Sequence, residues 1–109
     1  MSQSGTSAQG RANPARGEAS LLVDGASVVL RPSFEALVAA EEELGPLFAL
    51  VERAAAGGLR VAEIAALFWH CQRDGAVPRE RIGAAIVEKG PAGVTPVLRV
   101  LLSQVLQGR

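Results

Sequence analysis

The chain has 109 residues, which is enough for one domain with a single hydrophobic core. Its 11 basic and 11 acidic side chains give a formal net charge of zero. This balance argues against a protein built to bind nucleic acid or an anionic membrane, because such binding draws on a basic excess. One cysteine and one histidine are too few for a disulfide within the chain or for a metal site made from these residue types. We expect no metal and no cofactor.

The same features bear on where the protein resides. A lone cysteine, Cys71, is compatible with a reducing cytoplasm. The most apolar stretch, from Val94 to Leu106, contains a proline and an arginine and is shorter than the ~20 residues that span a bilayer. The N-terminus lacks the apolar segment of a secretory signal. We therefore expect a soluble, cytoplasmic protein without a membrane segment.

Residues 1–16, MSQSGTSAQGRANPAR, are small or polar and show no apolar periodicity. Such a segment buries too little apolar surface to offset the entropy lost on ordering. We predict a disordered N-terminal tail over residues 1–16 and a single domain over residues 17–109.

The domain is predicted to begin with a β-hairpin over residues 18–31. The dipeptide Asp24-Gly25 stands between two apolar runs, and a tight I′ turn needs positive φ at both central positions. This turn pairs Val23 with Ala26, and it places one set of side chains on one face of the ribbon: Ala19, Leu21, Val23, Ala26, Val28 and Leu30. An isolated hairpin is marginal in water, so the ribbon is expected to lie on the helices that follow.

The remainder of the chain is predicted to be helical. Ser33 is placed to cap a first helix whose apolar face begins with Phe34, and glycines separate the later helices. The predicted helices cover about residues 33–44, 46–56, 61–74, 78–89 and 95–107, the last opened by the pair Thr95-Pro96. The expected fold class is α+β, with an N-terminal β-hairpin packed on a compact bundle of four to five short helices.

The last predicted helix is apolar over more than the ~100° stripe that a surface helix needs. It is either central in the bundle or partly exposed as a partner surface. Trp69 lies off the apolar stripe of its own helix, so it is either a second-layer core residue or a partly exposed anchor of an interface. The candidate partner-binding residues are Trp69, Val97, Leu98, Leu101, Leu102 and Val105.

No catalytic site is predicted. His70 and Cys71 are neighbours, and adjacent helical residues point about 100° apart, which prevents a nucleophile–base pair. The acidic run Glu41–Glu43 fans around its helix and is typical of a solvated face, with pairing of Glu41 to a nearby cation as the alternative. We expect the protein not to be an enzyme.

A helix-turn-helix is one alternative interpretation of residues 61–89. Arg79 and Arg81 would then stand at the N-terminal end of a reading helix, where base contacts are made. Glu80, Glu88 and the zero net charge argue against DNA binding.

The first two thirds of the domain resemble a known family. The chain is similar to the small tail-assembly proteins of gene transfer agents and long-tailed phages, a family labelled tail tube protein or tail assembly chaperone. The resemblance covers about residues 17–75, and it is carried by Gly17-Glu18, Asp24-Gly25, Leu30-Arg31-Pro32-Ser33, Phe34, Ala36-Leu37, Glu41 and Leu44-Gly45, then more loosely by residues 58–60 and 66–69. These are positions of the hairpin, the helix cap and the core.

The resemblance implies a tail-morphogenesis protein. Proteins of this kind are expected to bind the apolar, helix-rich tape-measure protein and keep it soluble until tail tube subunits polymerise around it. A structural component of the tail, associated with the particle, is the alternative, although two short strands offer little sheet from which to build a ring. The expected partners are the tape-measure protein or other tail proteins, and a net charge of zero also leaves self-association open.

Overall fold

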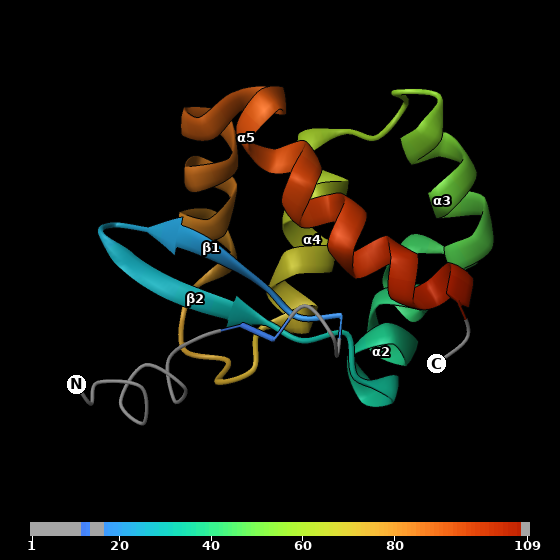
Figure 1. Ribbon diagram of the computed structural model, residues 1–109, viewed down its shortest axis with the longest axis horizontal. Helices are drawn as coiled ribbons and strands as arrows, with labels where there is room; N and C mark the ends of the chain where they lie inside the picture. Colours follow the sequence, from blue (N-terminus) through green and yellow to red (C-terminus); the bar gives the residue numbers. More distant parts are fainter. Residues whose placement is uncertain (1–11, 14–16, 108–109) are drawn as a thin grey trace.

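The computed structural model describes residues 12–13 and 17–107 of the chain (Figure 1). A two-stranded antiparallel hairpin, β1 (Ala19–Val23) and β2 (Ala26–Leu30), is followed by the helices α2 (Phe34–Leu44), α3 (Leu47–Ala55), α4 (Val61–Cys71) and α5 (Arg79–Gln107). The predicted α+β class is thereby confirmed. The predicted disordered tail lies outside the described residues, except for Ala12 and Asn13.

The hairpin has the predicted turn and register. Asp24 and Gly25 have φ values of 53° and 82°, as a I′ turn requires, and Val23 pairs with Ala26. The face of β1 formed by Ala19, Leu21 and Val23 is buried, and β1 packs against α5.

The chain that follows α4 pairs with the outer edge of β2, a contact that sequence periodicity does not predict. Leu30 forms an isolated bridge with Gln72. The backbone N–H of Arg31 donates to the carbonyl of Cys71 at 2.6 Å, and that of Arg73 donates to the carbonyl of Val29 at 2.9 Å. The link from α4 to α5 therefore lies along the hairpin. Within residues 12–13 and 17–107, β1 has a strand on one side only.

Hydrogen bonds at the start of the domain fix the chain entering β1. The Asn13 N–H donates to Oε1 of Glu18 at 2.9 Å, and the Glu18 N–H donates to the Asn13 carbonyl at 3.0 Å. The Glu18 carboxylate also lies 3.6 Å from Arg31, so this buried acid has both a donor and a cation beside it.

The helix α2 begins as predicted, since the Ser33 side chain accepts a hydrogen bond from the Ala36 N–H at 3.2 Å. The predicted position of Phe34 on its apolar face is wrong. Phe34 is 82% exposed, because it occupies the first position of α2 and the buried residue of that helix, Ala40, lies on another face.

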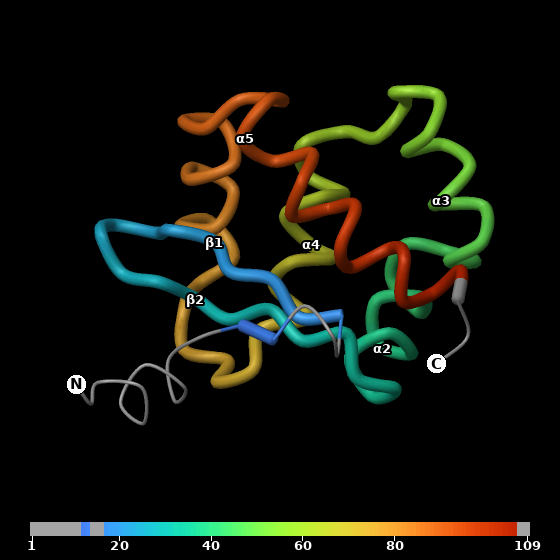
Figure 2. Tube along the Cα trace, viewed as in Figure 1, coloured from blue at the N-terminus to red at the C-terminus, as the bar shows by residue number. Residues whose placement is uncertain are grey.

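The helix α4 lies at the centre of the molecule, with α2 on one side and α5 on the other (Figures 1 and 2). Phe68 and Cys71 of α4 are fully buried. The largest fully buried side chains come from every strand and helix except α2, and they are Phe68, Leu21, Leu30, Leu50, Leu67, Ile82, Leu101 and Cys71.

The helix α5 consists of two halves joined at Gly90, whose φ of 73° and ψ of 177° are not helical. The second half begins at Pro91 and not at the predicted Thr95-Pro96 pair, so Pro96 lies inside the helix. A proline in the first turn of a helix removes only an N–H that has no helical partner, which explains why Pro91 can open this half. The second half runs back across α4 towards α3 (Figure 1).

We expect Gly90→Ala to lower the free energy of unfolding by about 1–3 kcal/mol, because the backbone region that Gly90 occupies is nearly restricted to glycine. A Cβ at this position would meet no atom within 4 Å, so the loss would come from the backbone alone. The control is Gly83→Ala, whose Cβ would lie 3.8 Å from that of Ala65 and which should gain up to about 1 kcal/mol in helix propensity. Urea denaturation of both variants measures the effect, and equal stabilities would contradict it.

Candidate functional site

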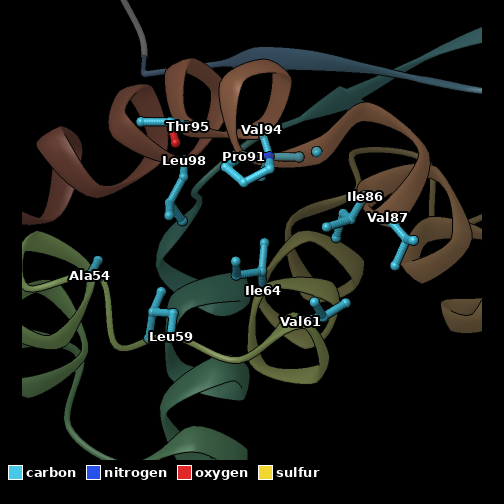
Figure 3. Close-up of a pocket in the computed structure, with 12 residues that line it drawn as sticks. Ala54, Leu59, Val61, Ile64, Ile86, Val87, Pro91, Val94, Thr95 and Leu98 are labelled. Atoms are coloured by element: carbon cyan, nitrogen blue, oxygen red, sulfur yellow. The ribbon is translucent and has the colours of Figure 1, made fainter.

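An apolar groove lies where the two halves of α5 face α4 and the segment joining α3 to α4 (Figure 3). Its volume is about 430 Å³. Ile64 and Val61 of α4 point towards α5, and Leu98 points from the second half of α5 towards Leu59 (Figure 3). The break at Gly90 turns α5 back on itself, so both of its halves line one groove.

A second hollow, of about 370 Å³, continues the groove between α3 and the second half of α5. The two hollows share Ala54, Thr95 and Leu98, so we treat them as one surface, the α5 groove. From Pro91 to Leu106 the groove follows α5 for about 22 Å, at roughly 1.5 Å per residue. Its length is that of a helix of about four turns, since one turn rises roughly 5.4 Å.

Exposed apolar side chains gather on this groove. Among the described residues, six large hydrophobic side chains are strongly exposed, and three of them line the groove: Val61, Val87 and Leu106, at 47%, 66% and 63%. A fourth, Phe48, shares a face of α3 with Val51 and Ala55 through i, i+3 and i+7 spacing. Apolar surface concentrated in this way is typical of binding surfaces, which makes the groove the candidate site.

The structure separates the six candidate residues predicted from the sequence. Leu98 and Leu102 line the groove, and Val97 and Val105 pack partly buried against the core. Leu101 is 1% exposed, so a partner does not reach it while the domain stays folded as it is, and Leu102, at 5%, presents only a small part of its side chain to the groove. Sequence reasoning left Val61, Val87 and Leu106 out of the set, although Leu106 lies on the same apolar helix. Binding by any of these residues stays a prediction.

Trp69 is part of a cluster that holds three helices together. The Arg79 guanidinium lies 4.5 Å from the centre of the Trp69 ring and donates to Oε2 of Glu43 at 2.6 Å. The His70 ring lies edge-on to Trp69 at 5.0 Å, and its Nε2 is 2.8 Å from Oε1 of Glu43. Because α2, α4 and α5 each contribute to these contacts, the half-buried Trp69 acts here as a second-layer core residue covered by a cation.

We expect Glu43 to make stability depend on pH. Hydrogen bonds from Arg79, and secondly from His70, hold the pKa of Glu43 below its ordinary value of 4.5. Since the pKa is lowered in the folded state, the stabilisation is present above the unfolded pKa and is lost as the pH falls through the folded one. Between about pH 5 and pH 3, the free energy of unfolding should therefore fall less in Glu43→Gln than in the unsubstituted protein. At pH 7 it should cost less than about 1 kcal/mol, because the carboxylate is partly exposed.

Urea denaturation at several pH values measures this effect. The control is Glu42→Gln, because Glu42 is exposed and forms no ion pair within the described part of the chain. A pH dependence that is the same in Glu43→Gln as in the unsubstituted protein would contradict the assignment.

The other carboxylates of this region also hold helices in place. Oε2 of Glu41 accepts the N–H of Leu47 at 3.1 Å, so Glu41 stabilises the start of α3, and among the described residues it forms no ion pair with a cation. Glu63 accepts two hydrogen bonds from Arg53, at 2.6 and 2.7 Å, which tie α3 to α4. Arg53 thereby holds the pKa of Glu63 below its ordinary value.

Cys71 is fully buried, and burial raises the pKa of its thiol to about 12. A thiol in this state is not a nucleophile near neutral pH. Among residues 12–13 and 17–107, no group of three or more acidic, histidine or cysteine side chains could hold a metal ion.

The arginines of the helix-turn-helix alternative are engaged within the chain. Arg81 forms an ion pair with Asp24 of the hairpin turn, in which its Nε donates at 2.6 Å, and Arg79 is held by Glu43. Each guanidinium is partly neutralised by its carboxylate, which lowers the positive charge that a DNA-binding surface would need. None of the described helices is long and apolar enough to cross a membrane.

Comparison with known proteins identifies the family. A family model described as "Phage tail tube protein, GTA-gp10" matches residues 16–108, which is most of the chain. No curated protein and no solved structure matches significantly. The match extends through the second half of α5, beyond the residues that carry the resemblance in the sequence. The chain belongs to the phage tail tube protein, GTA-gp10, family and is a tail protein of the gene transfer agent and phage type.

Proposed function

We propose that this protein is a non-enzymatic tail assembly chaperone, and that it holds an apolar helical segment of the tape-measure protein in the α5 groove. The observation that carries this proposal is the exposure of Val61, Val87 and Leu106 along one groove. An amphipathic helix that lays its apolar face into such a groove covers these side chains and its own apolar stripe together.

The chemistry of a holding chaperone requires little more than this surface. A protein that binds an aggregation-prone client without changing it acts by mass action, since the bound client is withdrawn from aggregation. The ionisable groups described above, Glu41, Glu43 and Glu63, join helices of the domain to one another. These roles support a binding protein over an enzyme.

Co-expression with the tape-measure protein tests the proposal. Size-exclusion chromatography with light scattering is expected to yield a soluble complex of the two proteins and its stoichiometry. If the tape-measure protein stays insoluble while this protein elutes alone, the chaperone function is wrong.

A structural role in the tail is the second candidate. It is favoured by the family description and by β1, which pairs with one strand only in the part of the chain that the structure describes and carries Leu22, 53% exposed. A strand from a neighbouring subunit could add to this edge and extend the sheet. Quantitative mass spectrometry of purified particles separates the two roles: a chaperone is absent from them, whereas a structural subunit is present at the copy number of a ring or a multiple of it.

A further inference from the structure

The rim of the α5 groove carries an excess of positive charge. In the described part of the chain, three basic side chains form no ion pair: Arg60, Lys89 and Arg99. Arg99 lines the groove, and the other two are sequence neighbours of lining residues: Lys89 precedes Gly90, and Arg60 stands between Leu59 and Val61.

The acidic side chains near the groove cancel this charge only in part. Glu63 is bonded to Arg53, so these two balance each other, although Glu63 also feels the charge of Arg60. Glu88 stands beside the lining residue Val87, is exposed, and forms no ion pair among the described residues. Glu52 of α3 is next to the lining residue Val51, so two unpaired carboxylates stand against three unpaired cations, and the charged residue that lines the groove itself is the cation Arg99.

We infer that the α5 groove selects an amphipathic helix of about four turns whose apolar face is flanked by carboxylates. This inference rests on the proposed function and specifies the chemistry of the client. The length follows from the span between Pro91 and Leu106, and the flanking charge follows from Arg60, Lys89 and Arg99. Charges at the rim of an interface steer association and discriminate between partners, while the apolar face supplies most of the affinity.

Two synthetic helical peptides test the inference on the full-length protein. Both have 16 to 18 residues, by design, with the same leucine face, and they carry glutamates or lysines beside that face. We expect the glutamate peptide to bind about tenfold more tightly at low salt, as a few rim ion pairs would provide. The difference should shrink when salt is raised, because exposed ion pairs are screened. Fluorescence anisotropy of labelled peptides measures the affinities.

Charge reversal identifies the side chains responsible. The double variant K89E/R99E is expected to remove or invert the preference, because it replaces two of the three unpaired cations. The control A76E adds negative charge on the exposed loop after α4, away from the groove, and should leave the preference unchanged.

The outcomes distinguish this inference from the proposed function. Equal affinity for the two peptides would overturn the charge selection and leave the apolar groove as the binding site. If neither peptide binds and a second copy of the chain occupies the groove in a dimer, the charge selection and the proposed chaperone function are both wrong. A preference for the lysine peptide would also overturn the inference.

Discussion

Leu101→Asp is expected to abolish the cooperative unfolding transition. Leu101 is 1% exposed in the second half of α5, and truncation of a buried leucine alone costs about 2–5 kcal/mol. Aspartate adds the cost of a carboxylate that has no partner in an apolar core. Together these losses reach or exceed the roughly 5 kcal/mol at the lower end of domain stability. Circular dichroism during heating would show a chain that is already unfolded at room temperature.

The matched control is Leu106→Asp on the same helix. Leu106 is 63% exposed, so the same substitution should change the melting temperature little. The pair tests which residues of this helix belong to the core. If Leu101→Asp melts like the unsubstituted protein, the assignment of Leu101 to the core is wrong.

The second large effect is expected on client binding. The double variant V87D/L106D places a charge on each of two exposed side chains, one at each end of the α5 groove. A buried charge without a partner opposes the binding of an apolar helix, so we expect the affinity for the tape-measure protein to fall by more than about 100-fold. Pull-down from a co-expressing strain and isothermal titration with a soluble tape-measure segment measure the loss.

Phe34→Asp provides the control for this effect. Phe34 is the most exposed of the large hydrophobic side chains in the described residues, at 82%, and it does not line the groove. Its substitution should leave the melting temperature and the client affinity close to those of the unsubstituted protein. A loss of binding in Phe34→Asp with full binding in V87D/L106D would place the client on α2 and contradict the groove.

Local signals were sufficient for the hairpin and the first helix. The Asp24-Gly25 turn allows one tight register, and alternation then determines which side chains of β1 face the core. Ser33 caps α2 because its hydroxyl meets a backbone N–H three residues later, an interaction within one turn. Features of this kind need no knowledge of the rest of the fold.

The second half of α5 began earlier than predicted because two proline signals competed. Both Pro91 and Pro96 can open a helix, and the Thr95-Pro96 pair carries the stronger local cap. The conformation of Gly90 decides between them, and it depends on how α5 folds back over α4. A sequence pattern does not contain that tertiary information.

The groove could be predicted only in part, for the same reason. Its lining comes from α3, α4, the segment between them and both halves of α5, which are far apart in the sequence. The apolar width of the last helix indicated a surface, but it did not separate the buried Leu101 from the exposed Leu106. Val87 follows the core residue Ile86 and could not be recognised as exposed before the position of α4 was known.

Site-specific photo-crosslinking in the complex with the tape-measure protein tests the central claim most directly. A photoreactive amino acid replaces Val87 in one sample and Phe34 in a matched one, and mass spectrometry identifies the linked peptides. We predict that the probe at Val87 links to an apolar helical segment of the tape-measure protein and that the probe at Phe34 does not. Links from Phe34 alone, or links from Val87 only to a second copy of this chain, would contradict a groove that holds the client.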